Sequence, residues 1–259
     1  MITPVVGIIP ARLGSTRFPG KVLASKTGKP LIQHVWESAR GAWSVSRLVV
    51  ACDDQKVARV VTDFGGEAIL TSPSHENGSS RLAEAARLLR IPGHALIVNI
   101  QGDEPEIDPI LIDSVVALAK ESGAEVTTLA SPFHENENPA DPNTVKVVLA
   151  AGGRAMYFSR ALIPFAREAG VSGAAPLRHI GLYVYRADFL QTYVSLQPGS
   201  CERTEMLEQL RVLEHGYSIA VAVHHCRGQG IDTPEQYEAF VTRFQGIVHK
   251  AAKSRQKVG

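Results

Sequence analysis

The sequence predicts an α/β fold with a mostly parallel central sheet flanked by helices, in a chain of 259 residues. Short apolar runs rich in valine and isoleucine are typical of strands that are buried on both faces. Segments of helical periodicity separate these runs, and the alternation favours a doubly wound sheet with right-handed crossovers. Hydrophobic residues make up 44% of the chain and charged residues 20%, which is an ordinary globular composition.

The expected strands are the apolar runs themselves. They cover residues 5–9, 48–51, 95–100, 126–129 and 145–149, with two further strands expected at 182–185 and 219–223. Because the first runs contain almost no polar residue, they predict strands in the interior of the sheet.

Helices are expected between the strands, at residues 31–40, 54–64, 81–89 and 108–122. Asp108 and Pro109 are suited to begin the last of these, as N-cap and first-turn residue. In the second half, helices are expected at 202–214 and at 234–244, the latter capped by Asp232 or Thr233. Residues 131–143 and 166–176 are expected to form loops.

The charge and the cysteines exclude several classes of protein. A formal net charge of +1 provides no overall field that would attract a nucleic acid or a membrane surface. The three cysteines are far apart and include no CxxC pair, so a disulfide framework is not expected. A cytoplasmic location is expected instead. Arg12 ends the first apolar run too early for a signal peptide, and no run approaches the length that spans a bilayer.

The first candidate site is the loop that follows the first expected strand. It contains Arg12, Arg17 and Lys21 together with Gly14 and Gly20. Open α/β sheets bind ligands at the carboxyl ends of their strands, and backbone amides beside glycines can hold phosphate there. The loop matches neither GxGxxG nor the Walker A spacing, and a merely solvated basic loop is the competing interpretation.

Two acidic segments are candidates for a metal site. Asp103 and Glu104 follow another buried strand, and Asp232 precedes the last expected helix. Magnesium favours one or two protein carboxylates combined with phosphate oxygens and waters. Helix capping is the competing role for Asp232, whereas Asp108 is better placed than Asp103 to cap its helix.

Two polar segments are less specific. The turn at residues 75–81 leads into a helix, whose N-terminus presents amides and hydroxyls to a polar ligand, although taken alone the segment is better explained as a plain capped helix start. His224, His225 and Cys226 lack a fourth ligand at a spacing typical of zinc sites.

Taken together, these motifs resemble the 3-deoxy-manno-octulosonate cytidylyltransferases (CMP-Kdo synthetases). The matching segments run in order from about residue 5 to 240: IPAR (9–12), STRFPGK (15–21), VNIQGDEP (98–105), DPNTVKVV (141–148), YFSR (157–160), RHIGLY (178–183), EMLEQLR (205–211) and DTPE (232–235). Each segment alone is moderately specific, and together in register they are highly specific.

The resemblance implies a nucleotidyltransferase fold of the glycosyltransferase-A type and usually a homodimer. It implies that CMP passes from CTP to the anomeric hydroxyl of 3-deoxy-manno-octulosonate (Kdo), with pyrophosphate released, for a bacterial lipopolysaccharide or surface glycan. One domain is implied over residues 1–250, with a nucleotide-binding part (about 1–130), a smaller sugar-binding and dimerisation part (about 131–230) and a basic tail (251–259).

The resemblance also implies roles for individual residues. Arg12, Lys21, Asp103 and Asp232 would be catalytic, with Asp103 and Asp232 as ligands of Mg²⁺. CTP would be bound by Arg12, Ser15, Arg17, Lys21, Asn77, Gly78, Ser79 and Arg81. Kdo would be bound by Gln101, Arg160, His179, Glu208 and Gln209.

The chain departs from the family pattern at two places. The family usually shows His-x-Ser-Gly-Thr-acidic-Arg where this chain has HENGSSR at 75–81, and Ala-Thr-Asp where it has Ala51, Cys52 and Asp53. Both departures fall where the base and ribose are expected, so they affect the nucleotide contacts rather than the phosphate or metal chemistry.

Three alternatives stay open. The acceptor is Kdo or another sugar acid, such as 8-amino-Kdo or a sialic acid. A glycosyltransferase of similar fold commonly carries an Asp-x-Asp motif, which this chain lacks. A non-catalytic nucleotide-binding protein has no need to keep both aspartates, Lys21 and the sugar-side residues.

Overall fold

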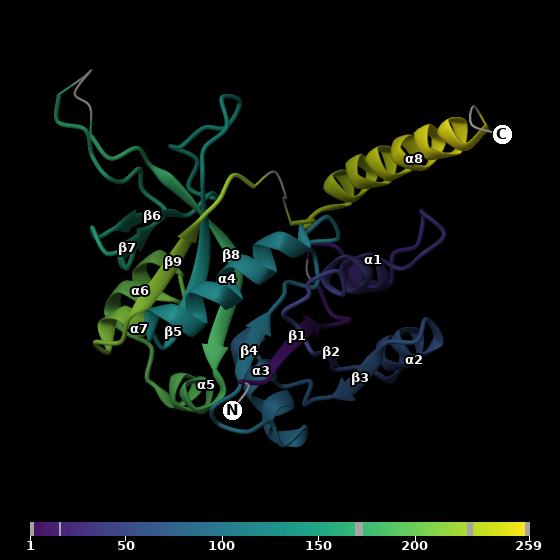
Figure 1. Ribbon diagram of the computed structural model, residues 1–259, viewed down its shortest axis with the longest axis horizontal. Coiled ribbons are helices and arrows are strands. Elements are labelled where there is room, and N and C mark those ends of the chain that lie inside the picture. Colours follow the sequence, from purple (N-terminus) through teal and green to yellow (C-terminus); the bar gives the residue numbers. More distant parts are fainter. Residues whose placement is uncertain (1–2, 16, 169–172, 227–229, 257–259) are drawn as a thin grey trace.

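The computed structural model describes residues 3–15, 17–168, 173–226 and 230–256 (Figure 1). Within them, nine strands form one sheet, in the order β3-β2-β1-β4-β8-β5-β9, with β6 and β7 joined beside β8. The strands are β1 (Val5–Ala11), β2 (Arg47–Cys52), β3 (Glu67–Leu70), β4 (Leu96–Asn99), β5 (Val126–Pro132), β6 (Lys146–Leu149), β7 (Ala155–Ser159), β8 (Leu177–Arg186) and β9 (Ile219–Val223).

The sheet is parallel over most of its width. β1 pairs in parallel with both β2 and β4, β2 with β3, and β5 with β9. β8 runs antiparallel to β4 and β5 and is inserted between them. The predicted mostly parallel sheet is therefore confirmed.

Helices cover both faces of the sheet. They are α1 (Leu31–Ala39), α2 (Gln55–Asp63), α3 (Gly78–Leu88), α4 (Pro109–Ser122), α5 (Ala187–Ser195), α6 (Ser200–Glu205), α7 (Leu210–Glu214) and α8 (Pro234–Gln256), with a 3-10 turn η1 (Lys21–Leu23). α1, α2 and α4 contribute to one hydrophobic cluster, and α3, α5 and α7 contribute to a second cluster on the opposite face.

The site lies where the strand order reverses. β1 and β4 are neighbours at the centre of the sheet, while the chain runs outward from β1 to β2 and β3 before it returns. The loops that follow β1 and β4 therefore open side by side at the carboxyl edge, where open α/β sheets bind their ligands.

α8 packs on α1 at the edge of the molecule (Figure 1). Tyr237 and Phe240 of α8 are buried against Leu31, the first residue of α1, in a third small cluster. α8 runs to Gln256, so it is longer than the predicted helix at 234–244.

The predicted helix at 202–214 is wrong, because the segment is divided into α6 and α7. Met206 has φ of +53°, which ends α6, and Leu207 beyond it turns into the core. Glu202 and Arg211 form a buried ion pair across the break. The apolar spacing fits one long helix as well as two short ones, so the sequence pattern does not reveal the left-handed residue.

Three elements were not predicted. β3 and β7 are short and only partly buried, so their apolar patterns are weak. α5 buries Phe189, Leu190 and Tyr193 on one face, which is a helical spacing. That spacing was a usable signal for α5.

Replacing Leu82 by alanine should lower the free energy of unfolding by about 2–5 kcal/mol, because this side chain of α3 is fully buried and a cavity would remain. Leu88→Ala is the matched control on the same helix, since its side chain is 44% exposed. It should cost less than about 1 kcal/mol. Chemical denaturation of both variants measures the difference, and equal losses would contradict the described packing of α3.

Candidate functional site

A cavity of about 360 Å³ opens at the carboxyl edge between β1 and β4, and is called here the first cavity. It is lined by Pro10, Arg12, Ser15, Arg17, Lys21, Val22, His75, Glu76, Asn77, Gly78, Arg81, Gln101, Gly102, Asp103, Glu208 and Asp232. Segments far apart in the sequence therefore meet in one place. Most of the predicted nucleotide and metal residues are among them.

The loop after β1 is held in a defined conformation. Gly20 adopts a left-handed conformation with φ of +69°, which favours glycine, and η1 begins at the next residue. The amide of Leu13 donates to Asp53 Oδ1 at 3.0 Å, so the end of β2 anchors the loop. Lys21 is thereby directed inward, with only 9% of the residue exposed.

Lys21 joins the two candidate metal aspartates. Its Nζ lies 2.9 Å from Asp103 Oδ2 and 3.3 Å from Asp232 Oδ1, and it donates to the carbonyl oxygen of Ile231 at 2.6 Å. Arg17 Nη2 lies 3.1 Å from the other carboxylate oxygen of Asp232. Two carboxylates separated by 129 positions thus converge on one point and face cations.

A backbone hydrogen bond explains this convergence. The amide of Ile231 donates to the carbonyl oxygen of Asp103 at 2.8 Å, which fixes the two segments side by side. Gly102 is required just before, because a Cβ at this position would lie 2.6 Å from the carbonyl oxygen of Pro10. Only glycine lets the loop after β4 lie this close to the end of β1.

Asp232 is not needed as the cap of α8. Gln236 N donates to Thr233 Oγ1 at 3.3 Å, and Gln236 Oε1 accepts from Thr233 N at 3.1 Å, which is the reciprocal pattern of a capping box. Thr233 therefore caps the helix, and the carboxylate of Asp232 faces the first cavity. Asp108 caps α4 as predicted, by accepting from Ile110 N at 3.0 Å.

Glu104 is separated from this group. It lines a different cavity, between α4 and the segment at 224–226, together with apolar residues such as Ile107 and Leu111. Burial raises the pKa of Glu104 to about 7, and the neighbouring charge of Asp103 acts in the same direction. Of the two adjacent acids, only Asp103 belongs to the first cavity.

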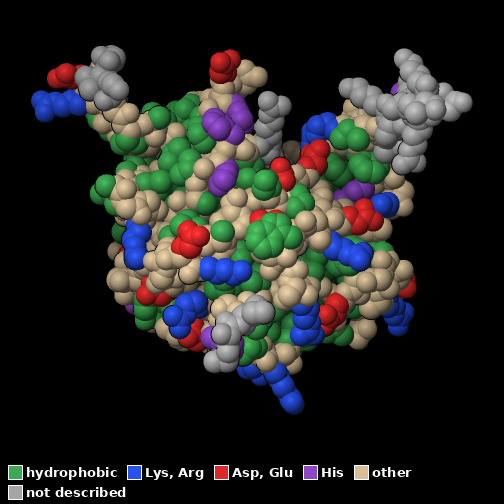
Figure 2. Space-filling view, viewed as in Figure 1, with side chains coloured by type: hydrophobic (Ala, Val, Ile, Leu, Met, Phe, Trp, Pro, Cys, Tyr) green, Lys and Arg blue, Asp and Glu red, His purple; other side chains and the backbone are tan. Residues whose placement is uncertain are grey.

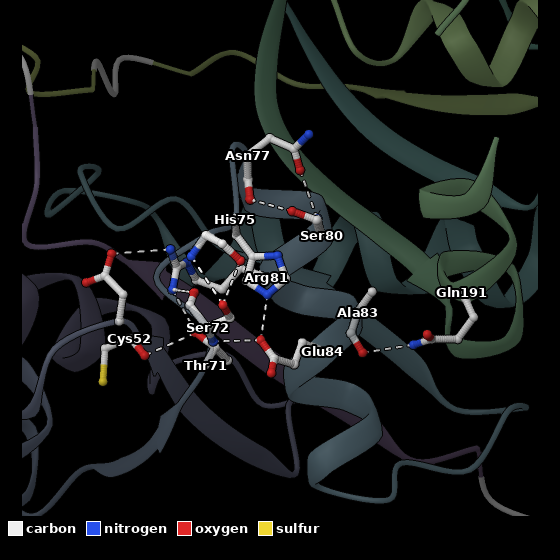
Figure 3. Close-up of polar contacts among 12 residues, drawn as sticks. Cys52, Thr71, Ser72, His75, Asn77, Ser80, Arg81, Ala83, Glu84 and Gln191 are labelled. Atoms are coloured by element: carbon white, nitrogen blue, oxygen red, sulfur yellow. Dashed lines mark hydrogen bonds and ion pairs between the residues drawn. The ribbon is translucent and has the colours of Figure 1, made fainter. Parts of the chain in front are cut away.

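The turn at residues 75–81 also lines the first cavity, and Figure 3 shows its polar contacts. Asn77 Oδ1 accepts from Ser80 N at 2.9 Å and so caps α3. His75 Nε2 lies 2.5 Å from Glu84 Oε2, a carboxylate that also accepts from Ser72 N. The helix start is thus a well-ordered edge of the cavity as well as a cap.

Arg81 is a buried member of this turn. It donates to Thr71 Oγ1 at 2.7 Å and to the carbonyl oxygen of Ser72 at 3.3 Å, and pairs with Asp53 at 3.3 Å. Asp53 therefore connects Arg81 with the loop after β1, through its bond to Leu13. Asp53 was not predicted as a site residue, although an acidic residue directly after a strand was an available signal.

A second cavity of about 270 Å³ adjoins the first, and is called here the second cavity. It is lined by Gly78, Ser79, Asn99, Gln101, Tyr183, Tyr185, Tyr193, Met206, Leu207, Glu208 and Gln209. Gly78, Gln101 and Glu208 line both cavities, so the two are contiguous. Asn99 and the three tyrosines were not predicted as site residues.

The residues shared by the two cavities are held in place. Gln101 Nε2 donates to the carbonyl oxygen of Gly181 at 2.8 Å. Glu208 Oε2 accepts from Ser79 Oγ at 3.3 Å, and burial raises the pKa of this carboxyl. The Glu208 backbone oxygen accepts from Tyr193 Oη at 2.9 Å. The break between α6 and α7 is what presents Glu208 and Gln209 to this cavity.

Two predicted sugar ligands lie outside both linings. The Arg160 guanidinium donates to the carbonyl oxygens of Glu205 at 2.7 Å and Pro142 at 3.0 Å, so it braces the chain around α6. His179 Nε2 lies 3.0 Å from Thr128 Oγ1, whose hydroxyl hydrogen bonds Leu182 O at 2.9 Å. Direct sugar contacts by Arg160 and His179 stay predictions.

The donor set fits a hard divalent cation. Among the described residues, no group of three or more His, Cys, Asp or Glu side chains could enclose a metal ion. Asp103 and Asp232 offer two carboxylates at an open cavity, which matches magnesium, because this ion completes its shell with phosphate oxygens and water.

None of the described helices is both long enough and apolar enough to cross a membrane.

Comparisons with known proteins agree with this geometry. A family model described as cytidylyltransferase matches residues 6–219. A 3-deoxy-manno-octulosonate cytidylyltransferase of Syntrophobacter fumaroxidans is 51% identical over 238 residues, which cover 92% of this chain and 95% of the relative. A protein of the same name from Leptospira biflexa is 47% identical over 247 residues, which cover 95% and 98%.

Solved structures are similar as well. A CMP:2-keto-3-deoxy-manno-octonic acid synthetase complexed with CTP has a TM-score of 0.88 and 39% identity, and the match covers 94% of this chain and 99% of that one. A 4-diphosphocytidyl-2C-methyl-D-erythritol synthase matches with a TM-score of 0.63 at 13% identity, which concerns the fold alone.

The wild-type protein should lose stability in mild acid because of His179. Burial lowers the pKa of His179 to about 3 from the ordinary 6.5, so below pH 6.5 the unfolded chain binds a proton that the folded chain does not. Stability is then unaffected by this group above about pH 6.5 and falls as the pH drops toward 3.

Between pH 7 and pH 5, wild type should lose about 1–2 kcal/mol more than His179→Gln. Urea denaturation at each pH measures this difference, and His94→Gln, at an exposed position, should follow wild type. Parallel curves for wild type and His179→Gln would show that the surroundings of His179 do not disfavour its charged form.

Proposed function

The chain belongs to the cytidylyltransferase family, and we propose that it transfers CMP from CTP to the anomeric hydroxyl of Kdo, with release of pyrophosphate. The observation that carries the proposal is the pair of contiguous cavities, which share Gly78, Gln101 and Glu208. One cavity is rich in cations and acids, and the other is lined by aromatic rings and hydrogen-bonding groups. A nucleoside triphosphate suits the first and a polyhydroxylated sugar acid suits the second.

The phosphates of CTP would bind to the loop after β1. Arg12 and Arg17 offer planar guanidinium groups, Lys21 a point charge, and Ser15 a hydroxyl, all in the lining of the first cavity. The nucleoside would then lie toward the start of α3, where Asn77, Gly78, Ser79 and Arg81 are located.

Asp103 and Asp232 would hold Mg²⁺ in the first cavity, which both of them line. When bound, the ion offsets phosphate charge and orients the reacting oxygens. Lys21, already between the two carboxylates, supplies a further positive charge within reach of the phosphates.

The reaction needs little covalent chemistry from the protein. The anomeric oxygen of the sugar forms a bond to the α-phosphorus, the bond from that phosphorus to the bridging oxygen breaks, and the hydroxyl proton is released. Positioning and charge neutralisation dominate such transfers. Gln101, Glu208 and Gln209 would hold the sugar, and Arg12 and Lys21 would stabilise the departing pyrophosphate.

A homodimer is the assembly that the exposed apolar residues support. Phe165 is 84% exposed, and Leu162, Met156 and Val223 are exposed on the same half of the chain. We propose that these side chains form the surface that a second copy of the chain covers, because contiguous exposed apolar patches mark association surfaces. We place the enzyme in the cytoplasm, since its three cysteines are far apart in the sequence and include no CxxC pair, and we place its product in lipopolysaccharide biosynthesis. Charges of both signs are intermixed on the face that Figure 2 shows, which suits small-molecule substrates rather than nucleic acid.

Purified protein should release pyrophosphate from CTP only when both Mg²⁺ and Kdo are present. Matched reactions replace Kdo by 8-amino-Kdo or a sialic acid, and CTP by UTP. Faster release with another sugar acid would keep the reaction and change the substrate. No release with any pair, in protein shown to be folded, would refute the proposed function.

Asp103→Asn should lower kcat at least about 100-fold, because it removes one of two carboxylates for the metal while it keeps the size of the side chain. Asp108→Asn is the matched control five positions away. Asn caps a helix about as well as Asp, so this change should leave the stability nearly unchanged and kcat within about twofold. If Asp103→Asn kept the wild-type rate at limiting Mg²⁺, Asp103 would not be a ligand of the metal.

Phe165→Asp should convert the dimer to a folded monomer in sedimentation velocity, because a charge would be introduced where an apolar side chain is covered. Trp43→Asp is the control. Trp43 is an apolar side chain that is 79% exposed, like Phe165, but it lies in a different part of the chain, in the loop between α1 and β2. It should leave the assembly unchanged. A dimer that survives Phe165→Asp would place the interface elsewhere.

A further inference from the structure

The wall of the second cavity contains a residue in an unfavourable backbone conformation, Met206. Its φ of +53° and ψ of +48° lie in the left-handed region, which is costly for a residue with a side chain. Among the residues that the structure describes, Arg90 is the only other non-glycine residue with a positive φ. Residues 206–209 all line the second cavity, so the direction of the chain at Met206 determines where Glu208 and Gln209 lie.

Arg160 holds Met206 in this conformation. Its Nε donates to the carbonyl oxygen of Glu205 at 2.7 Å, and its Nη2 donates to the carbonyl oxygen of Met206 at 3.3 Å. These two carbonyl groups belong to the peptide units on either side of the Met206 Cα, and the orientations of the two units define φ and ψ of this residue. One guanidinium group therefore restrains both angles. Left-handed residues of this kind persist where the surrounding structure holds them, and they are frequent at ligand sites.

Glu205 holds Arg160 in its place. One oxygen of the Glu205 carboxylate accepts from the backbone amide of Arg160 at 2.9 Å, and the other accepts from Ser159 Oγ at 2.6 Å. In addition, the carbonyl oxygen of Arg160 accepts from the ammonium group of the buried Lys146. Neither Glu205 nor Ser159 belongs to the lining of either cavity. Glu205 can therefore affect a ligand only through the segment that it holds.

We propose that Glu205 is a positioning residue for the sugar acid. It keeps Arg160 bound to the turn at Met206, and this turn places Glu208 and Gln209 against the sugar in the second cavity. The inference rests on the proposed function, because it takes a sugar acid as the occupant of that cavity. Without the restraint the binding groups would be free to move, and a displacement of about 1 Å is enough to slow a reaction about 100-fold.

Glu205→Ala tests the proposal, because it removes both carboxylate acceptors. The KM for Kdo should rise about 10-fold or more, since Glu208 and Gln209 would no longer be restrained. The KM for CTP should stay within about threefold of wild type, since the cations proposed to bind its phosphates belong to the loop after β1. Glu205→Gln keeps the size of the side chain and one acceptor oxygen, so it should raise the KM for Kdo less. This variant carries the test if the alanine variant does not fold.

Met206→Gly separates a positioning role from a merely structural one. Glycine adopts the left-handed conformation freely, so the turn then needs less support from Glu205. In the double variant Glu205→Ala/Met206→Gly, the KM for Kdo should return to within about threefold of wild type. Met206→Gly alone should leave this KM within about twofold, because the replaced side chain is 76% exposed.

Arg90→Gly is the matched control. Arg90 has a φ of +52°, close to that of Met206, but it follows α3 and lies outside the linings of both cavities. Glycine at this position relieves the same backbone strain, yet it should not lower the raised KM of Glu205→Ala. Equal restoration by the two glycine substitutions would show that Glu205 contributes to stability alone, and would overturn the inference.

The inference can fail while the proposed function stands. It is overturned by an unchanged KM for Kdo in both Glu205 variants, or by a raised KM that Met206→Gly does not restore. A raised KM in Met206→Gly alone also overturns it, because the effect would then belong to that side chain. A wild-type protein that releases no pyrophosphate with any sugar acid overturns the proposed function and this inference with it.

Discussion

Both cavities depend on the close approach of the loop after β4 to the end of β1. Gly102 lies against the carbonyl oxygen of Pro10, and no larger residue fits there without a shift of the backbone. The approach directs Asp103 toward the loop that carries Lys21, and the backbone bond from Ile231 brings Asp232 to the same point. A steric limit at one glycine thereby determines where the charges of the site meet.

The charges of the first cavity are arranged in pairs rather than as a uniform basic patch. Lys21 and Arg17 contact the two aspartates, and Arg81 contacts Asp53. Such pairing keeps the buried ionic groups satisfied when no nucleotide is bound, which isolated cations in a partly buried cavity would not be.

Most of the fold and much of the site were predictable because they rest on local patterns. Apolar runs correspond to the central strands, and the polar residues that follow β1 and β4 lie at their carboxyl ends, where Lys21 and Asp103 meet. Asn99 was not predictable as a site residue, since it is part of an apolar run and its place in the lining of the second cavity is visible only in three dimensions. The division of residues 202–214 depends on one left-handed residue, Met206, which no helical periodicity reveals. Asp53 acts through Leu13 and Arg81, and the only sign of it in the sequence is its position directly after β2.

The capping box at the start of α8 separates two tasks that often fall on one side chain. Thr233 and Gln236 form the hydrogen bonds that cap the start of α8. Asp232, which directly precedes Thr233, is therefore not needed to cap the helix. Under the proposed function, one of these adjacent positions serves folding and the other serves the chemistry. A relative that lost the enzymatic activity could replace Asp232 and still keep Thr233. The residues found at these two positions would therefore distinguish an active relative from an inactive one.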